Sequence, residues 1–330
     1  MQIDLKTVNI EPKRKAFDHL VRRFGDKPAS RYQEASYDIQ ATENLHYRPT
    51  WAPEQELYDP TISRIVMADW HALKDPRQYY YNSYVLTRAR QQEAAEGAFA
   101  LVESRGLHLT VPEEMREQIL DLLVPLRHAA WGANQNNVLV SGYGFGTPFT
   151  QPCLYYGMDC LAVAQYLSRI GLMLGGVDAL ARGKAQWMDN EEWQPLRRLV
   201  EDTLVVRDPF ELFIAQDVVI DGLLYPLIYD SIIDGRMAQN GAAPVSMLTQ
   251  FMTDWGKETR KWAISVVKVA AAESEANAVI IGEWFRTWSE RAMAALLPVI
   301  AKVMGEDADQ LLAGGLDDLK AQLAKAGVSL

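Results

Sequence analysis

The sequence predicts an all-α fold, and three observations support this class. Side-chain acceptors followed by proline and then by Glu or Gln mark helix starts at Asp75, Thr110 and Asp208. Apolar residues with helical spacing follow the second start, over residues 119–130. Almost no segment shows the alternation of apolar and polar residues that is typical of a strand. These signals favour a bundle of long helices.

The composition indicates a globular protein with a negative net charge. The 330 residues are 48% hydrophobic and 23% charged, with a formal net charge of -10. This composition argues against disorder, and the acidic balance argues against a nucleic-acid partner. We find no run of about 18 apolar residues and no signal-peptide core at the start of the chain, so we expect a cytoplasmic protein without a membrane segment.

The chain divides into an extended N-terminal arm, residues 1–58, and a helical domain, residues 59–330. The arm shows no helical period and contains several prolines. Rigid aromatic side chains supply contact area at low entropic cost, so we expect the arm to cover the surface of a partner. The alternative is that it wraps its own bundle. The candidates for interface residues are Tyr32, Tyr37, Tyr47, Trp51 and Tyr58.

Helix signals after residue 59 predict eight helices. The three caps start helices at residues 76, 111 and 209, and a glycine-rich loop at 142–146 ends the second of them. Because no strand precedes this loop, it does not match a phosphate-binding motif. Pro125 and Pro226 lie inside predicted helices and should kink them. The predicted ranges are 76–104, 111–141, 152–174, 191–203, 209–234, 245–272, 275–304 and 316–326.

Two short segments resemble broken halves of a metal-binding motif. In four-helix bundles that hold two metal ions, two helices each carry Glu-x-x-His, because residues three apart share one helix face. Here Pro125 stands in the Glu place before His128, and Lys261 stands in the His place after Glu258. A proline has no ligand atom, and an ammonium group repels a metal ion. We therefore expect no metal, no cofactor and no catalytic residue in this chain.

Loss of a metal pair would leave interior carboxylates without a counter-charge, and a buried unpaired carboxylate is costly or takes up a proton. One hypothesis is that Lys261 replaces the metal charge by pairing with Asp217 or Asp221. Arg127 and Arg260 would then hold neighbouring carboxylates. The alternative is that all three cations extend into solvent.

Two other functions compete with a metal-free subunit. One is an active oxidase of the same bundle type that recruits unusual ligands, and the other is a free-standing helical scaffold. Metal content separates the oxidase from the subunit, and co-purifying chains separate the scaffold from it. The unusual ligand set would comprise His128, Glu93, Asp217 and Glu258.

The run from Asp75 to Tyr84, with residues 58–61 and 68–70 before it, resembles the beta subunit of bacterial multicomponent monooxygenases. Within that family the chain is most similar to the phenol hydroxylase oxygenase small (beta) component, over nearly its whole length. The resemblance implies a ferritin-like, ribonucleotide-reductase-small-subunit-like bundle with extra helices. It also implies that the chain is paralogous to the large alpha subunit, which carries the di-iron site, and has itself lost the ligands. Pro125 and Lys261 fit that loss.

The resemblance further implies a hydroxylase that contains two copies each of alpha, beta and gamma subunits. Such a complex converts phenol to catechol with molecular oxygen and with electrons from NADH. A reductase with FAD and a 2Fe–2S cluster delivers the electrons, and a small regulatory protein assists. The beta subunit would support assembly of the catalytic alpha subunit. The alternative within the family is a beta subunit of a toluene or other di-iron monooxygenase.

Overall fold

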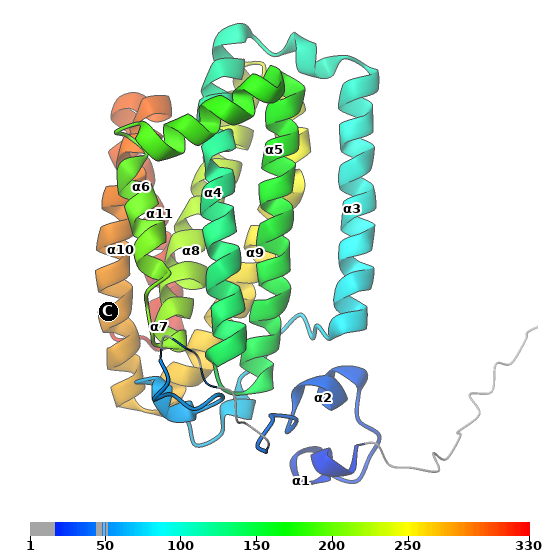
Figure 1. Ribbon diagram of the computed structural model, residues 1–330, viewed down its shortest axis with the longest axis vertical. Coiled ribbons are helices and arrows are strands. Elements are labelled where there is room, and N and C mark those ends of the chain that lie inside the picture. The colour runs from blue at the N-terminus through cyan, green and yellow to red at the C-terminus, as the bar shows by residue number, and fades with distance from the viewer. Residues whose placement is uncertain (1–16, 44–47, 49, 51) are drawn as a thin grey trace, which may run out of the picture.

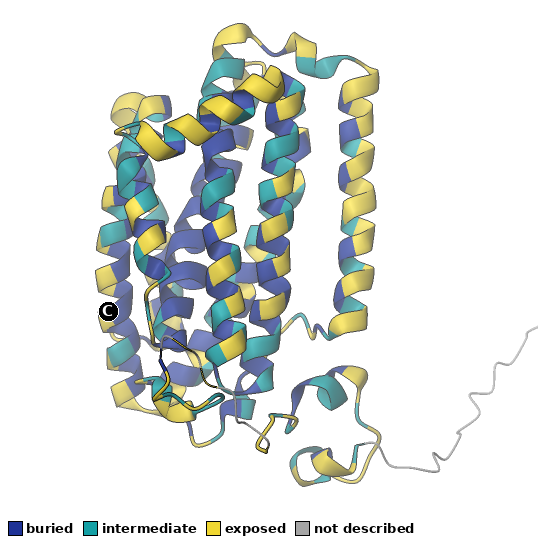
Figure 2. Cartoon of the chain, in the orientation of Figure 1, coloured by how far each residue is buried: buried dark blue, intermediate teal, exposed yellow. Residues whose placement is uncertain are grey.

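The computed structural model describes residues 17–43, 48, 50 and 52–330. In this part of the chain the regular structure is helical and contains no strand, which confirms the predicted all-α class. Long helices lie side by side in a bundle, and the helix α3 (Tyr81–Ser104) stands at one edge of it (Figure 1). Buried residues line the inward faces of the long helices, whereas α3 is mostly exposed (Figure 2).

Four long segments form the centre of the bundle, and their buried side chains belong to one hydrophobic core. Three of these segments are α4 (Glu113–Tyr143), α5 (Thr147–Asp189) and α9 (Ala243–Glu273). The fourth is continuous and consists of α7 (Pro209–Phe213), the π-helix η5 (Ile214–Ile220), α8 (Asp221–Tyr225) and the π-helix η6 (Pro226–Met237). The helices α6 (Gln194–Thr203), α10 (Glu275–Met304) and α11 (Ala308–Lys325) complete the bundle. Short 3-10 helices are η1 (Asp18–Leu20), η2 (Pro60–Ile62), η3 (Trp70–Ala72), η4 (Leu107–Thr110), η7 (Ala238–Asn240) and η8 (Gly305–Asp307).

Of the three predicted caps, only Asp208 starts a helix. Its carboxylate accepts hydrogen bonds from the backbone N–H groups of Phe210 and Glu211. The same kind of signal at Asp75 is misleading, because that carboxylate accepts from the backbone and the side chain of Arg77. The helix α3 consequently begins only at Tyr81.

Two further departures arise from backbone conformation. The helix predicted at 152–174 begins earlier, at Thr147, and a kink follows it at Gly176, which takes a non-helical conformation (φ 65°, ψ -162°). A second helical stretch then continues to Asp189. The expected disturbance at Pro226 takes the form of a π-helix, which starts at this proline and extends to Met237. A π-helix is wider than an α-helix, and such stretches are frequent at functional sites.

Two helical stretches are long and apolar enough to cross a membrane by length and composition, although the sequence analysis found no such run. They are residues 147–189 and 209–240. In the second stretch 94% of the apolar window is buried inside the bundle, so its composition is that of a core helix. In the first stretch 33% of the window is buried, and α5 exposes Leu154, Met158 and Leu161.

Residues 17–43 of the arm contain helices, which the sequence analysis did not predict. They form α1 (Val21–Phe24) and α2 (Arg31–Ser36). The start of α2 has a reciprocal capping box, in which Ser30 and Gln33 each accept a hydrogen bond from the other's backbone N–H. This Ser-x-x-Gln signal is visible in the sequence and was missed.

The described part of the arm packs on its own chain. The rings of Tyr32 and Tyr37 are buried together with Leu20. The hydroxyl oxygen of Tyr32 accepts a hydrogen bond from the backbone N–H of Asp75, which joins the arm to the segment before α3. Of the other interface candidates, Tyr58 is half-buried, and Tyr47 and Trp51 lie outside the described residues. A partner could therefore contact little of the Tyr32 and Tyr37 rings, and an interface role of the arm stays a prediction.

Candidate functional site

The four positions of the broken metal motif do not meet at one centre. Pro125 is buried inside α4, while His128 stacks on Trp187 with ring centroids 5.6 Å apart. Burial, followed by the charges of Arg127 and Lys184, lowers the pKa of His128 to about 4. Glu258 pairs with arginines, and Lys261 is exposed.

The inward face of α9 explains why these positions diverge. Trp255, Thr259 and Trp262 are the buried residues around the motif, so Glu258 and Lys261 each lie one position outside that face. Glu93, a ligand of the rival oxidase, is exposed on α3. Among the described residues no group of three or more His, Cys, Asp or Glu side chains could hold a metal ion. The residues present do not fit a di-metal site.

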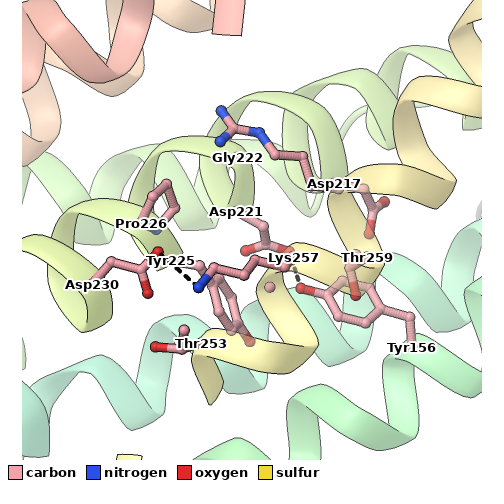
Figure 3. Close-up of a pocket in the computed structure, with 12 residues that line it drawn as sticks. Tyr156, Asp217, Asp221, Gly222, Tyr225, Pro226, Asp230, Thr253, Lys257 and Thr259 are labelled. Atoms are coloured by element: carbon pink, nitrogen blue, oxygen red, sulfur yellow. Dashed lines mark hydrogen bonds and ion pairs between the residues drawn. The ribbon is translucent and has the colours of Figure 1, made fainter. Parts of the chain in front are cut away.

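The bundle interior instead contains two buried aspartates, which η5 and α8 place one helical turn apart (Figure 3). Asp221 accepts hydrogen bonds from the hydroxyl of Tyr156 at 2.8 Å and from the amide of Gln216 at 2.9 Å. Among the described residues no donor has normal hydrogen-bond geometry to either carboxylate oxygen of Asp217, although the side chain of Asn137 is close enough to lower its pKa. Both aspartates line a cavity of about 110 Å³.

Burial disfavours the charged form of both aspartates. It raises the pKa of Asp221 to about 7, against the lowering effect of the hydrogen bonds from Tyr156 and Gln216. The pKa of Asp217 rises well above its usual range, because of burial first and of the negative charge of Asp221 second. Nearby, the side-chain oxygen of Asn137 also lacks a hydrogen-bond donor. A proton on Asp217 would supply that donor and would remove the uncompensated charge.

The structure contradicts the hypothesis that lysine replaces the metal charge. Lys261 is exposed and forms no ion pair in the described part of the chain, so its pairing with Asp217 or Asp221 is wrong. Arg127 donates a hydrogen bond to the backbone oxygen of Leu180 at 2.7 Å rather than to a carboxylate. The physical reason is helix phase, since Lys261 directs its side chain away from the interior. Protonation is therefore the simpler way to neutralise Asp217.

Arg260 was expected to hold a neighbouring carboxylate, but it forms no ion pair with one in the described part of the chain. Two of its nitrogens, Nε and Nη2, are buried without a hydrogen-bond partner in the described structure. Burial lowers the pKa of Arg260, while the charges of Asp318 and Asp230 act in the opposite direction. These carboxylates influence Arg260 through space, without a direct ion pair.

Lys261→Met should change the free energy of unfolding by less than about 0.5 kcal/mol, because exposed side chains away from special features contribute little. Urea unfolding followed by circular dichroism would measure this change. Lys268→Met, another exposed lysine on α9, serves as the control. A cost of about 3 kcal/mol or more would show that Lys261 compensates a buried carboxylate after all.

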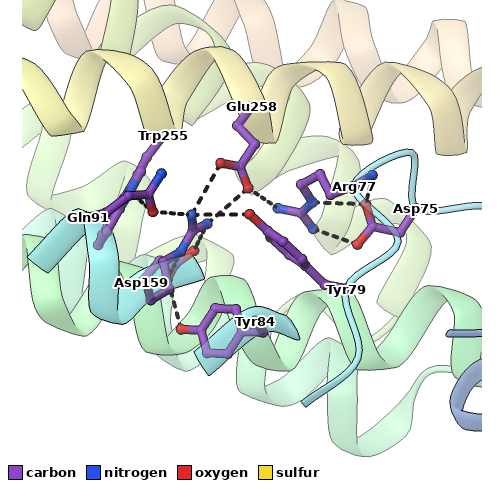
Figure 4. Close-up of polar contacts among 9 residues, drawn as sticks. Asp75, Arg77, Tyr79, Tyr84, Gln91, Asp159, Trp255 and Glu258 are labelled. Atoms are coloured by element: carbon purple, nitrogen blue, oxygen red, sulfur yellow. Dashed lines mark hydrogen bonds and ion pairs between the residues drawn. The ribbon is translucent and has the colours of Figure 1, made fainter. Parts of the chain in front are cut away.

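A second cluster, which we call the arginine network, attaches α3 to the bundle (Figure 4). Arg88 on α3 donates to Asp159 on α5 at 2.7 and 2.9 Å, and to Glu258 on α9 at 3.1 Å. Arg77, in the segment before α3, pairs with Asp75 at 2.8 Å and approaches Glu258 to 3.7 Å. Glu258 is thus shared by two arginines and is not available as a metal ligand.

Aromatic rings surround both arginines of this network. The guanidinium of Arg88 lies 4.7 Å from the ring centre of Trp255, and that of Arg77 lies 4.7 Å from the ring centre of Trp262. Burial alone would lower the pKa of Arg88, but Asp159 and Glu258 outweigh it and raise this pKa. The sequence analysis missed this network. Asp159 was its visible signal, because a lone acidic residue inside an apolar helix requires a partner.

Comparison with known proteins gives a consistent result. A family model described as Methane/Phenol/Alkene Hydroxylase matches residues 51–274. The chain is 49% identical over 307 residues to the phenol 2-monooxygenase oxygenase component DmpL of Pseudomonas sp. strain CF600, covering 92% of each chain. It is 44% identical over 310 residues to the phenol 2-monooxygenase oxygenase component MhpL of Acinetobacter pittii strain PHEA-2, covering 93% of each chain.

Solved structures confirm the predicted ferritin-like fold. A chain of xenon-pressurized phenol hydroxylase from Pseudomonas sp. OX1 superposes with a TM-score of 0.92 at 48% identity, covering 99% of both chains. A chain of toluene 4-monooxygenase has a TM-score of 0.76 at 19% identity, covering 92% of this chain and 100% of that one, and shows a shared fold. The chain therefore belongs to the methane, phenol and alkene hydroxylase family, and within it is similar to the oxygenase components of phenol hydroxylases.

Proposed function

We propose that this chain is the non-catalytic beta subunit of an NADH-dependent phenol 2-monooxygenase, and that it supports assembly of the catalytic alpha subunit. The observation that carries the proposal is the bundle interior. The chain has the fold of a family of hydroxylases, yet Asp217 and Asp221 line the interior cavity without any histidine, and the described residues contain no group of three possible metal ligands. The identity to phenol 2-monooxygenase oxygenase components supports phenol as the substrate of the complex.

In this proposal the chemistry belongs to the partners. The alpha subunit would hold the di-iron site, and a reductase with FAD and a 2Fe–2S cluster would pass electrons from NADH. Gamma subunits, a second copy of this chain and a regulatory protein would complete the cytoplasmic assembly. The chain itself would bind no cofactor.

The test is co-expression of this chain with its alpha and gamma partners, followed by size exclusion and iron analysis. We expect one stable complex whose iron co-elutes with the alpha subunit. The chain purified alone after iron loading should hold far less than one iron per polypeptide. Stoichiometric, chelator-resistant iron in the isolated chain would contradict the proposal.

Deletion of residues 1–53 should leave the bundle helical, because α3 to α11 begin later in the chain. Co-elution with the alpha subunit should be lost or strongly weakened, because the part of the arm that stays exposed, rather than the buried rings of Tyr32 and Tyr37, would contact the partner. Far-ultraviolet circular dichroism and size exclusion would measure the two effects. Tyr32→Phe is the control, since it keeps the arm and removes only a hydroxyl group, which bonds to Asp75 and Tyr37. Normal co-elution of the folded, truncated chain would show that the arm is not an assembly element.

A further inference from the structure

The cavity beside Asp217 contains more unpartnered polar atoms than a dry interior tolerates. Asp217 and Thr259 are each 2% exposed, and neither the carboxylate oxygens of the first nor the hydroxyl of the second has a hydrogen-bond partner. Arg260, which also lines the cavity, has two buried nitrogens without partners. Each such group destabilises the folded protein when it stays unsatisfied. A ligand that both donates and accepts hydrogen bonds would remove these costs.

The cavity connects the interior with the surface. Its inner wall contains Asp217, Asp221 and Thr259, and its lining also includes Asp230 and Lys257. These last two residues form an ion pair at 3.8 Å, and their side chains are 35% and 63% exposed (Figure 3). Small molecules can therefore approach the aspartates from the side where this pair lies.

We propose that this cavity is a binding site for a cluster of ordered water molecules, which hydrogen-bonds Asp217, Thr259 and Arg260 and carries protons between the buried carboxyl pair and solvent. The volume of about 110 Å³ has room for several waters, since one water needs about 10–15 Å³ of such space. Buried waters typically make about three hydrogen bonds each, which the mixed donors and acceptors of the lining can supply.

The charges around Asp217 favour water over a metal ion. Arg260 lines the same cavity and repels a cation, Lys257 is paired with Asp230, and the cavity lining contributes no histidine. When a proton leaves Asp217, the electron pair of the O–H bond remains on the carboxylate and the proton passes along the waters to solvent. The titratable groups that interact electrostatically with Asp217 are Asp221, Arg77, Cys153, Tyr156 and Cys160. The other titratable groups that line the cavity are Tyr225, Asp230, Lys257 and Arg260.

The first experiment looks for the water directly. In the full-length chain with labelled threonine methyl groups, the methyl of Thr259 should show a nuclear Overhauser effect to a long-lived water. Thr249 is the matched control, because it is also 2% exposed on α9 but donates to backbone oxygens and does not line the cavity. Water contact at Thr259 alone supports the proposal. Equal signals at both threonines, or none at Thr259, would overturn it.

The second experiment follows the proton. Carbon-13 labelling of aspartate side chains should reveal two buried carboxyl groups that titrate reversibly while the bundle remains native by near-ultraviolet circular dichroism. Asp217→Asn keeps the shape and should remove one of these signals, which assigns it. If the assigned group changes protonation only when the protein unfolds, the cavity provides no route for protons and the proposal fails. Neither readout depends on the partners, so this result is independent of the proposed subunit role.

Discussion

Replacing Arg88 with methionine should lower the free energy of unfolding by about 3–5 kcal/mol, because one partner of a buried ion pair would be left uncompensated. Asp159 is 1% exposed, and it would lose both hydrogen bonds from the guanidinium. Of its two arginines, Glu258 would retain only the more distant Arg77. Methionine preserves much of the side-chain length, so the loss would report charge and hydrogen bonding more than packing.

Urea unfolding of the full-length chain would measure this loss. Arg182→Met is the control, because Arg182 also contacts two carboxylates, Glu117 and Asp121, but its side chain is 41% exposed. That substitution should cost less than about 1 kcal/mol, as exposed ion pairs usually do. Adding Asp159→Asn to Arg88→Met should restore part of the stability by removing the unpaired charge. Equal costs for Arg88→Met and Arg182→Met would show that the arginine network is effectively solvated.

The arginine network also connects α3 to the rest of the bundle, at whose edge Figure 1 shows this helix. Arg88 is the residue of α3 that pairs with both α5 and α9. We therefore expect faster amide hydrogen exchange throughout α3 in Arg88→Met, while α10 should stay protected. The arginine network thus determines how firmly α3 is held.

Local signals in the sequence predicted the fold class and several helix ends. The range of α10 was predicted to the residue, and Asp208 caps α7 because its carboxylate has no competing partner within the turn. Asp75 carries a similar signal, but Arg77 two residues later takes its carboxylate. A cap is predictable from sequence only where no neighbouring cation competes for the acceptor.

The candidate site was harder to predict, because its location depends on helix rotation. Spacing of three residues places Glu258 and Lys261 on one face of α9, but it does not reveal which face points inward. Trp262 occupies the inward face, so Lys261 beside it lies outside. Asp217 and Asp221 were identified as candidates from their spacing. Their burial and their hydrogen-bond partners could not be predicted, because these depend on other helices.

A side chain at Gly183 should destabilise the bundle more than any single polar change outside the arginine network. The helices α4 and α5 lie in close contact, and a Cβ atom at Gly183 would lie 2.4 Å from Cγ1 and 2.9 Å from Cβ of Val124. Val124 is fully buried and precedes Pro125, so it cannot move towards solvent. Overpacking typically costs about 1–3 kcal/mol, and a larger side chain costs more. We expect Gly183→Ala to cost about 2–3 kcal/mol and Gly183→Leu to prevent native packing of α4 on α5.

Thermal and urea unfolding, with near-ultraviolet circular dichroism for side-chain packing, would measure these effects. Gly97 in α3 is the matched control, because a Cβ atom there meets no atom within 4 Å. Gly97→Ala should be neutral or stabilising by up to about 1 kcal/mol, since alanine favours a helix more than glycine does. Val124→Ala removes the methyl group nearest to the new Cβ, so it should recover part of the loss in the Gly183→Ala background. Full stability of Gly183→Ala alone would mean that α4 and α5 can separate at this contact without cost.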